Sequence, residues 1–151
     1  MSYNFQEQVN DNRQKEGCLA VKKYLVEQGL EIQDVSENKE YFERGIDLII
    51  KWPNEHETID VKTDMQAHMT GNIPIELMEI VPENGRIKEG WIYKNLDYIY
   101  YYIYHTKEIK KLPMKKLREL TFNKTWRGYA SHHDKPFPYY TLGVLIPIQE
   151  L

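Results

Sequence analysis

The sequence predicts an α+β fold in a single domain spanning residues 1–151, with a sheet of mostly antiparallel strands flanked by helices. Three observations predict this fold. Apolar residues near the start recur at spacings of three and four, several short β-branched runs are bounded by turn residues, and a Lys-rich helical segment precedes a last apolar strand. The length of 151 residues and the hydrophobic fraction of 41% suit one domain with one core.

The composition excludes several classes of protein. With 8 Gly, 7 Pro and 41% hydrophobic residues, the chain is neither collagen-like nor disordered. No apolar run reaches the roughly 18 residues that a membrane span needs, and the first residues lack the apolar stretch of a signal peptide. The only cysteine, Cys18, cannot form an internal disulfide, which fits a reducing compartment. We therefore expect a cytoplasmic protein that does not bind membranes.

The first predicted element is a helix from about residue 4 to residue 28. Its apolar residues follow helical spacing, and Gly29 then provides a C-terminal stop. A short strand is expected over 30–35, and a polar loop over 36–44 ends at Gly45.

The clearest unit is a predicted antiparallel hairpin. Its first arm, 46–52, is rich in β-branched residues, a polar turn follows at 53–56, and the second arm runs over 57–64. If the turn is symmetric, the numbers of opposed residues sum to 109, the sum of the flanking positions 52 and 57. This register places Asp47 directly across from Lys62.

Side chains alternate along a strand, so the hairpin has one charged face and one apolar face. The charged face is predicted to hold Asp47, Lys51, Asp60, Lys62 and Asp64, and the apolar face Ile46, Leu48, Ile50, Ile59 and Val61.

The rest of the chain alternates between predicted strands and loops and contains one further helix. Strands are expected over 73–80, 97–104 and 108–112, a helix over 114–122, a loop over 123–138 and a closing strand over 140–150. Pro113 suits the first turn of that helix.

The formal net charge is −3, but the charge is unevenly distributed. Residues 106–127 hold eight basic and two acidic side chains, a net charge of +6, which leaves about −9 for the rest. A basic segment beside an acidic body suits a protein that approaches phosphate on one side, and the alternative is an ordinary solvated Lys-rich helix. DNA contacts are expected from Lys110, Lys111, Lys115, Lys116, Arg118, Lys124 and Arg127.

The charged face of the hairpin points to metal chemistry. Mg²⁺ prefers oxygen ligands, and it commonly takes one or two carboxylates while substrate phosphate replaces its waters. Asp47 and Asp60 provide two carboxylates, and Lys62 can orient a metal-bound water or neutralise charge that develops on phosphorus. The alternative is an ordinary cross-strand ion pair between Asp47 and Lys62, which leaves Asp60 unexplained.

Gly45-Ile46-Asp47, followed by Asp60-Val61-Lys62, resembles the motif of the PD-(D/E)XK nuclease superfamily, which includes restriction endonucleases and archaeal-type Holliday junction resolvases. The resemblance covers about residues 13–120, and Ile46 stands where the motif has proline.

This resemblance implies a restriction-endonuclease-like α/β/α core and a site for Mg²⁺ or Mn²⁺. The metal would be bound by Asp47, Asp60 and the Val61 carbonyl, with Lys62 beside the nucleophilic water. Many members complete the site with a glutamate on the first helix, and Glu16 is the best-placed candidate.

Other candidates have simpler explanations. Glu76 either extends the acidic cluster or forms the polar side of its strand. Cys18 follows a helical apolar pattern and is predicted to be a core residue. The stretch His132–Asp134 lacks the second ligand pair that a zinc site needs.

These features together predict a Mg²⁺-dependent endodeoxyribonuclease that hydrolyses phosphodiester bonds. The small size favours a structure-selective, junction-resolvase-like enzyme, bacterial or phage-encoded, and cuts on two strands favour a homodimer. One alternative is a catalytically inactive nuclease-fold module that binds DNA or a protein partner, which the overall acidity favours. Another is a phosphodiesterase that acts on RNA or sugar phosphates.

Overall fold

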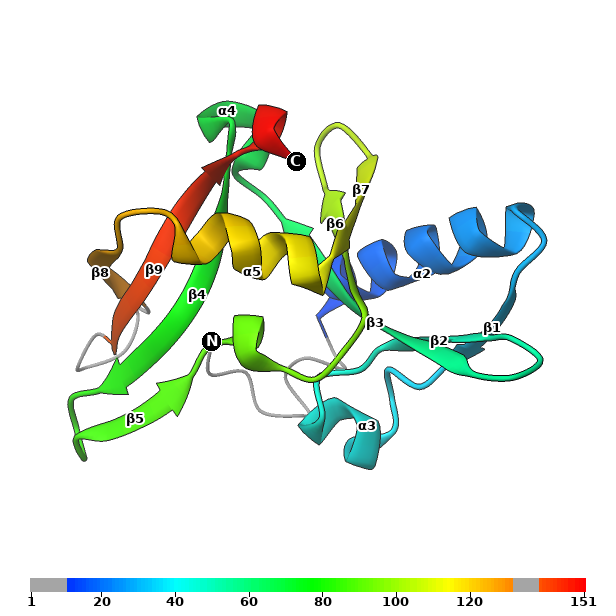
Figure 1. The fold of residues 1–151 in the computed structure, drawn as a ribbon, viewed down its shortest axis with the longest axis horizontal. Helices are drawn as coiled ribbons and strands as arrows, with labels where there is room; N and C mark the ends of the chain where they lie inside the picture. Colours follow the sequence, from blue (N-terminus) through cyan, green and yellow to red (C-terminus); the bar gives the residue numbers. More distant parts are fainter. Residues whose placement is uncertain (1–10, 132–138) are drawn as a thin grey trace. The chain divides into compact units, whose positions relative to one another are not determined.

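The computed structural model describes residues 11–131 and 139–151 of the chain. It has the predicted α+β architecture, with two sheets and several helices (Figure 1). The fold divides into two compact units, the first extending to Thr70 and including Asn95–Lys115, and the second formed by Gly71–Lys94 and Lys116–Leu151. A single domain over 1–151 therefore stays a prediction. The start of the first helix near residue 4 is wrong, because Asp11 is in an extended conformation and caps a helix that begins at Asn12. The stretch His132–Asp134 lies outside the described residues.

The first unit is built on a five-stranded sheet in the order β1-β2-β3-β6-β7. Its strands are β1 (Glu31–Asp34), β2 (Leu48–Lys51), β3 (His56–Asp64), β6 (Tyr98–Ile103) and β7 (Glu108–Pro113). Neighbouring strands pair antiparallel except β3 and β6, which are parallel. The predicted antiparallel character is therefore confirmed for most of the sheet, and the central parallel pair is the exception.

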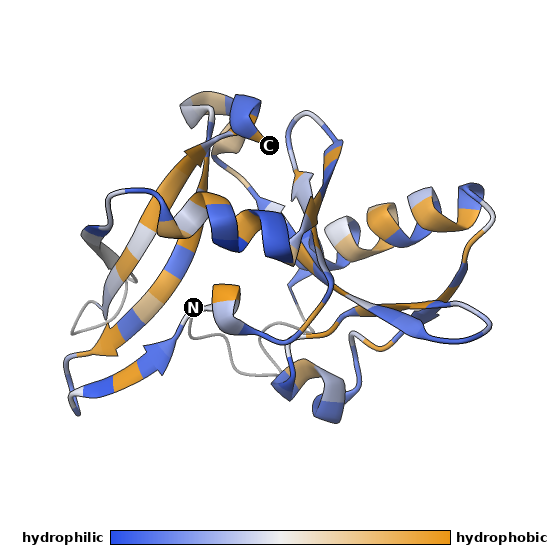
Figure 2. Ribbon diagram, viewed as in Figure 1, coloured by the Kyte–Doolittle hydropathy of each residue, from blue (hydrophilic) through white to orange (hydrophobic). Residues whose placement is uncertain are grey.

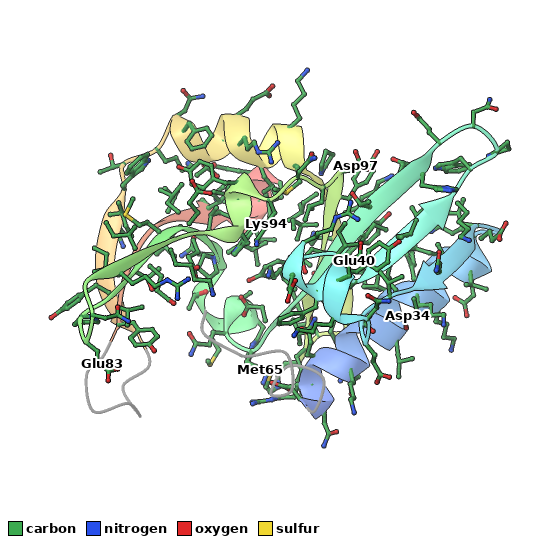
Figure 3. The ribbon with its side chains drawn as sticks, turned by 90° about the horizontal axis from the view of Figure 1, so that it is seen from below. Asp34, Glu40, Met65, Glu83, Lys94 and Asp97 are labelled. Carbon is green, nitrogen blue, oxygen red and sulfur yellow. The ribbon has the colours of Figure 1, made fainter. Side chains whose placement is uncertain are left out.

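Asp97, labelled in Figure 3, ties the start of β6 to β3. Its carboxylate accepts hydrogen bonds from the backbone N–H of Thr58 at 2.8 Å and from the Thr58 hydroxyl at 3.2 Å. Its own N–H donates to the Thr58 carbonyl at 3.1 Å. These contacts lie next to the first residue pair of the parallel ladder, Ile59 with Tyr98, and so stabilise its register.

Helix α2 (Asn12–Glu27) packs against β3, β1 and β6 (Figure 1). Asp11 caps it by accepting hydrogen bonds from two backbone N–H groups of the first turn, and Gly29 follows its end with a φ of 82°. Hydrophobic and hydrophilic residues alternate along its coil (Figure 2). The apolar side forms a core cluster with the sheet, made of Cys18, Val21, Leu25, Leu48, Ile50, Ile59, Val61 and Tyr100.

Two short helices lie in segments predicted as loops. Helix α3 (Lys39–Glu43) lies within the expected loop over 36–44, and the side chain of Asn38 caps it. Helix α4 (Ala67–Thr70) follows β3, and the Asp64 carboxylate accepts hydrogen bonds from the N–H groups of Gln66 and Ala67, both at 2.6 Å. Helices of four or five residues present too little apolar periodicity to be predicted from sequence.

The hairpin register differs from the prediction by two residues. The turn spans residues 52–55, and the paired residues run from Lys51 with His56 to Leu48 with Ile59, so opposed numbers sum to 107. Asp47 is therefore not opposite Lys62 but lies just beyond the last pair. A shift of two residues keeps every side chain on its face, which is why most of the predicted faces are correct.

Ile46 is the exception to these predicted faces. It packs with Val35 and Ile49 in a separate small cluster, and not with the apolar face of the hairpin. It precedes β2 and so lies outside the alternation of that strand.

The second unit contains a four-stranded antiparallel sheet in the order β5-β4-β9-β8. Its strands are β4 (Asn72–Val81), β5 (Arg86–Glu89), β8 (Arg127–Ser131) and β9 (Tyr139–Pro147), with the short helices η1 (Trp91–Tyr93) and η2 (Ile148–Glu150). Helix α5 (Met114–Phe122) begins at the last residues of the first unit and continues into the second. Strands β5 and β8 were not predicted.

Among the described residues, no helix is both long and apolar enough to cross a membrane.

Gly17 determines how closely α2 approaches β3. A Cβ at this position would lie 2.1 Å from Thr63 Oγ1, closer than side chains tolerate, and 3.2 Å from Tyr102 Cδ1, which is a tight contact. We expect Gly17→Ala to lower the free energy of unfolding by about 1–3 kcal/mol, as overpacking does elsewhere, and urea denaturation measures this loss.

A double-mutant cycle identifies the cause of that loss. Thr63→Ala removes the Oγ1 atom, which is buried without a hydrogen-bond partner, so we expect Gly17→Ala to cost less in the Thr63→Ala background. Equal costs in the two backgrounds would contradict the steric explanation.

Candidate functional site

The candidate site lies where β2 and β3 separate. The last residue pair of their ladder is Leu48 with Ile59, and beyond it the N–H of Asp47 still donates to the Ile59 carbonyl at 2.8 Å. Further along β3, side chains take the place of a strand partner for the backbone of Val61. Its N–H donates to Asp47 Oδ2 at 2.8 Å, and its carbonyl accepts from Gln14 Nε2 at 2.9 Å.

Asp47 and Asp60 lie together as a buried pair of carboxylates. Each residue is only 5% exposed. Burial raises the pKa of Asp47 well above its ordinary value, and the negative charge of Asp60 raises it further, while the hydrogen bond from the Val61 N–H opposes the shift. Buried carboxylates in contact are costly to maintain, and such pairs are typical of functional sites.

Lys62 provides the positive charge beside this pair. Its Nζ lies 2.9 Å from Asp60 Oδ2, and its side chain is 34% exposed. The ammonium therefore touches a buried carboxylate on one side and reaches solvent on the other. A ligand that approaches the carboxylates from solvent would meet this ammonium.

Of the predicted metal ligands, Asp47 and Asp60 lie together, and the Val61 carbonyl follows Asp60 on β3 and accepts the hydrogen bond from Gln14. All three donate oxygen, as a hard divalent cation requires. Among the described residues, no group of three His, Cys, Asp or Glu side chains is arranged to hold a metal. These oxygen donors are of the type that Mg²⁺ prefers, and a Mg²⁺ ion held by them would keep open positions for water or phosphate.

The structure places Glu16 in another network. Glu16 Oε2 is 2.8 Å from Lys107 Nζ and accepts a hydrogen bond from the Tyr102 hydroxyl at 2.8 Å. The hydrogen bonds from Lys107 and Tyr102 lower the pKa of the Glu16 carboxyl. These contacts link α2 to β6 and to the turn before β7.

Gln14 is the helix residue that contacts the candidate site, and sequence reasoning missed it. Gln14 precedes Cys18 by four residues, so both lie on the α2 face that packs on the sheet. Helical periodicity therefore carried a signal for this position. Because metal ligands are expected to be carboxylates, the sequence favours Glu16 over the amide of Gln14.

The remaining candidate residues have other surroundings. Glu76 lies on β4 in the sheet of the second unit, whereas the candidate site is formed entirely within the first unit. Asp64 caps α4 and also accepts a hydrogen bond from the Tyr101 hydroxyl. Cys18 is a core residue as predicted, and burial raises the pKa of its thiol.

The predicted DNA-contacting residues belong to both units. In the first unit, Lys111 Nζ lies 4.5 Å from the centre of the Tyr98 ring, Lys110 lies on β7, and Lys115 is exposed. In the second unit, Lys116 and Arg127 are exposed.

Two residues of that basic set have partners within the second unit. Lys124 Nζ lies 2.8 Å from Glu150 Oε2. Arg118 donates hydrogen bonds to the carbonyls of Ile92 at 2.9 Å and Lys94 at 2.7 Å. Arg118 therefore has a structural role in the second unit.

Comparisons with known proteins bear on the fold. No protein-family model matches the chain, and no curated protein matches it. Among solved structures, the chain is similar to a bacterial homing endonuclease, with a TM-score of 0.54 and 11% sequence identity over 70% of each chain. At this identity the likeness shows a shared fold and nothing more. Membership of the PD-(D/E)XK superfamily therefore stays a prediction.

The raised pKa of Asp47 predicts a pH-dependent stability. The folded state holds the Asp47 proton to a higher pH than the unfolded state does, so the free energy of unfolding falls as pH rises between the two pKa values. Asp47→Asn removes this titration and can still accept the Val61 N–H. We expect the variant to be more stable than the wild type at pH 7, with a difference that shrinks as the pH falls to about 4, near the ordinary pKa of aspartate.

Urea denaturation at a series of pH values measures this difference. A variant that is less stable than the wild type at pH 7, or a stability difference that does not change with pH, would contradict the effect attributed to Asp47.

Proposed function

We propose that the protein is a metal-dependent DNA endonuclease that hydrolyses phosphodiester bonds. One observation carries the proposal: two buried carboxylates lie together where β2 and β3 separate, and a partly exposed lysine contacts one of them. The fold is similar to that of a bacterial homing endonuclease, which supports nucleic acid as the substrate class. The residues from Asp60 to Lys62 are part of the motif on which the resemblance to the PD-(D/E)XK superfamily rests.

Each residue has a distinct role in the proposed reaction. Asp47, Asp60 and the Val61 carbonyl would hold Mg²⁺ or Mn²⁺. When bound, the cation would polarise the phosphate and lower the pKa of a coordinated water. Lys62 would donate a hydrogen bond to the attacking water or to a phosphate oxygen, and its charge would oppose the negative charge that develops on phosphorus. The family resemblance implies in-line attack that leaves 5′-phosphate and 3′-hydroxyl ends.

The finer features of the proposal concern the substrate and the assembly. Selection of DNA by its structure, such as a four-way junction, is part of the proposal, and the substrate panel below includes a synthetic junction to test it. Cutting both strands symmetrically requires two sites, which favours a homodimer.

The alternative is a module that binds DNA or a protein without cutting. The net charge of −3 favours it, because an enzyme that must hold DNA for cleavage is expected to be more basic. The buried carboxylate pair favours the enzyme, because a binding module has no need of two costly buried acids.

Cleavage assays distinguish these functions. We expect the wild type to cut at least one of four substrates (supercoiled plasmid, linear duplex, single strand or a synthetic four-way junction) with Mg²⁺ or Mn²⁺, and not with EDTA. Asp60→Asn and Lys62→Met each remove a group that acts on the transition state, so each should lower the rate by about 100-fold or more.

Matched controls make the same chemical changes elsewhere in the first unit. Asp34→Asn on β1 and Lys51→Met on β2 should leave the rate within about threefold of the wild type. If the wild type cuts none of the four substrates but retards some of them in a gel, the binding module replaces the enzyme as the conclusion.

The basic residues predict a salt dependence of DNA binding. Lys115 and Lys116 are adjacent and exposed on α5. Replacing both with alanine should weaken binding and reduce the slope of log K against log salt by about 2, because each lost phosphate contact removes about one released counterion. Fluorescence anisotropy at several salt concentrations measures the slope.

Lys22 and Lys23 on α2 are the matched adjacent pair for this measurement. Their double alanine variant should keep the wild-type slope. Equal slopes for the wild type and the Lys115→Ala/Lys116→Ala variant would exclude these two lysines from the DNA interface.

A further inference from the structure

The helix residue at the candidate site is an amide where a carboxylate would complete a metal site. Gln14 Nε2 donates to the Val61 carbonyl at 2.9 Å, and this carbonyl is one of the three predicted metal ligands. The residue with a carboxylate on the same helix, Glu16, is paired with Lys107. Helix α2 therefore brings a neutral donor, and no additional negative charge, to the site.

The charge balance of the site follows from its side chains. Within the described part of the chain, Asp47 and Asp60 contribute two formal negative charges, and Lys62, 2.9 Å from Asp60, contributes one positive charge. The formal charge of these three groups is therefore −1. Cation sites gain affinity with the number of charged ligands, and Mg²⁺ gives up its water reluctantly, so this site offers a free divalent cation little attraction.

A DNA phosphate would supply the missing negative charge. The Lys62 side chain, 34% exposed, links the buried carboxylates to solvent, which is the side from which a phosphate would arrive. One phosphate would bring the formal charge of the site to about −2, enough to balance a divalent cation. Binding of the cation and of the phosphate would then favour each other equally, as thermodynamic linkage requires.

We infer that Gln14 keeps the affinity of the free protein for divalent cations low, so that the metal is bound firmly only together with DNA. Gln14 thus acts as a positioning residue that holds the Val61 carbonyl and does not ligate the metal. The inference rests on the proposed function, because it assigns a regulation to the same site. As a consequence, the free protein would carry little bound metal before it binds DNA.

Gln14→Glu tests the inference because it adds the missing carboxylate. A glutamate cannot donate to the Val61 carbonyl, so without metal the variant should be less stable than the wild type. A cation bound between the new carboxylate and the Val61 carbonyl would remove the repulsion between these two oxygen groups. The matched control is Gln33→Glu, which makes the same change on an exposed position of β1.

The experiment measures Mn²⁺ binding by electron paramagnetic resonance on the full chain, with and without a DNA duplex, after subtraction of Mn²⁺ bound by the DNA alone. For the wild type we expect DNA to tighten Mn²⁺ binding by about tenfold or more. For Gln14→Glu we expect about tenfold tighter binding without DNA, and a larger rise in melting temperature on Mn²⁺ addition than for the wild type. Gln33→Glu should behave as the wild type in both measurements.

The outcomes separate this inference from the proposed function. If the wild type binds Mn²⁺ equally well with and without DNA and still cuts DNA, the inference is wrong and the nuclease stands. If DNA tightens Mn²⁺ binding to the wild type but Gln14→Glu, folded by circular dichroism, binds no tighter than Gln33→Glu, the role of Gln14 is overturned. If no protein binds Mn²⁺ with or without DNA and none cuts, the proposed function fails together with the inference.

Discussion

The separation of β2 from β3 after the Leu48–Ile59 pair is the constraint on which the candidate site depends. A strand that loses its neighbour leaves backbone N–H and carbonyl groups that need new partners when they are buried. For Val61, the Asp47 carboxylate takes the N–H and the Gln14 amide takes the carbonyl. The same gap that requires these side chains holds the Asp47 carboxylate, which lies beside Asp60, against the backbone of Val61. The geometry of the site thus follows from the need to satisfy the backbone.

This arrangement places a costly pair of acidic groups among the otherwise apolar buried side chains of the first unit. Asp47 and Asp60 repel each other in a buried position, and a single ammonium, that of Lys62, offsets part of that cost. Burial of the apolar cluster between α2 and the sheet stabilises the fold and offsets the free-energy cost of burying this pair. Gly17 contributes to the same cluster because it allows α2 to approach β3 closely. A strained acidic pair on a well-packed support is the usual compromise between stability and activity.

The sequence predicts the faces of the hairpin better than its register. Side chains repeat every second residue, so a shift of one position in the turn moved the pairing by two residues, which took Asp47 away from Lys62 but left both on the charged face. The parallel pairing of β3 with β6 could not be predicted in the same way, because it joins segments separated by β4 and β5 and depends on contacts such as those of Asp97. Local periodicity carries no information about such distant partners.

The sequence alone also led to the wrong residue of α2 at the candidate site, Glu16 in place of Gln14. Two residues apart on a helix, their side chains point about 200° away from each other, so only one of them can face β3 where Val61 lies. Helical phase relative to Cys18 selects Gln14, whereas chemical expectation selects the carboxylate of Glu16, and the structure follows the helical phase. The helix therefore presents an amide to the site. In the proposed function, further negative charge for the metal would come from a phosphate of the bound DNA.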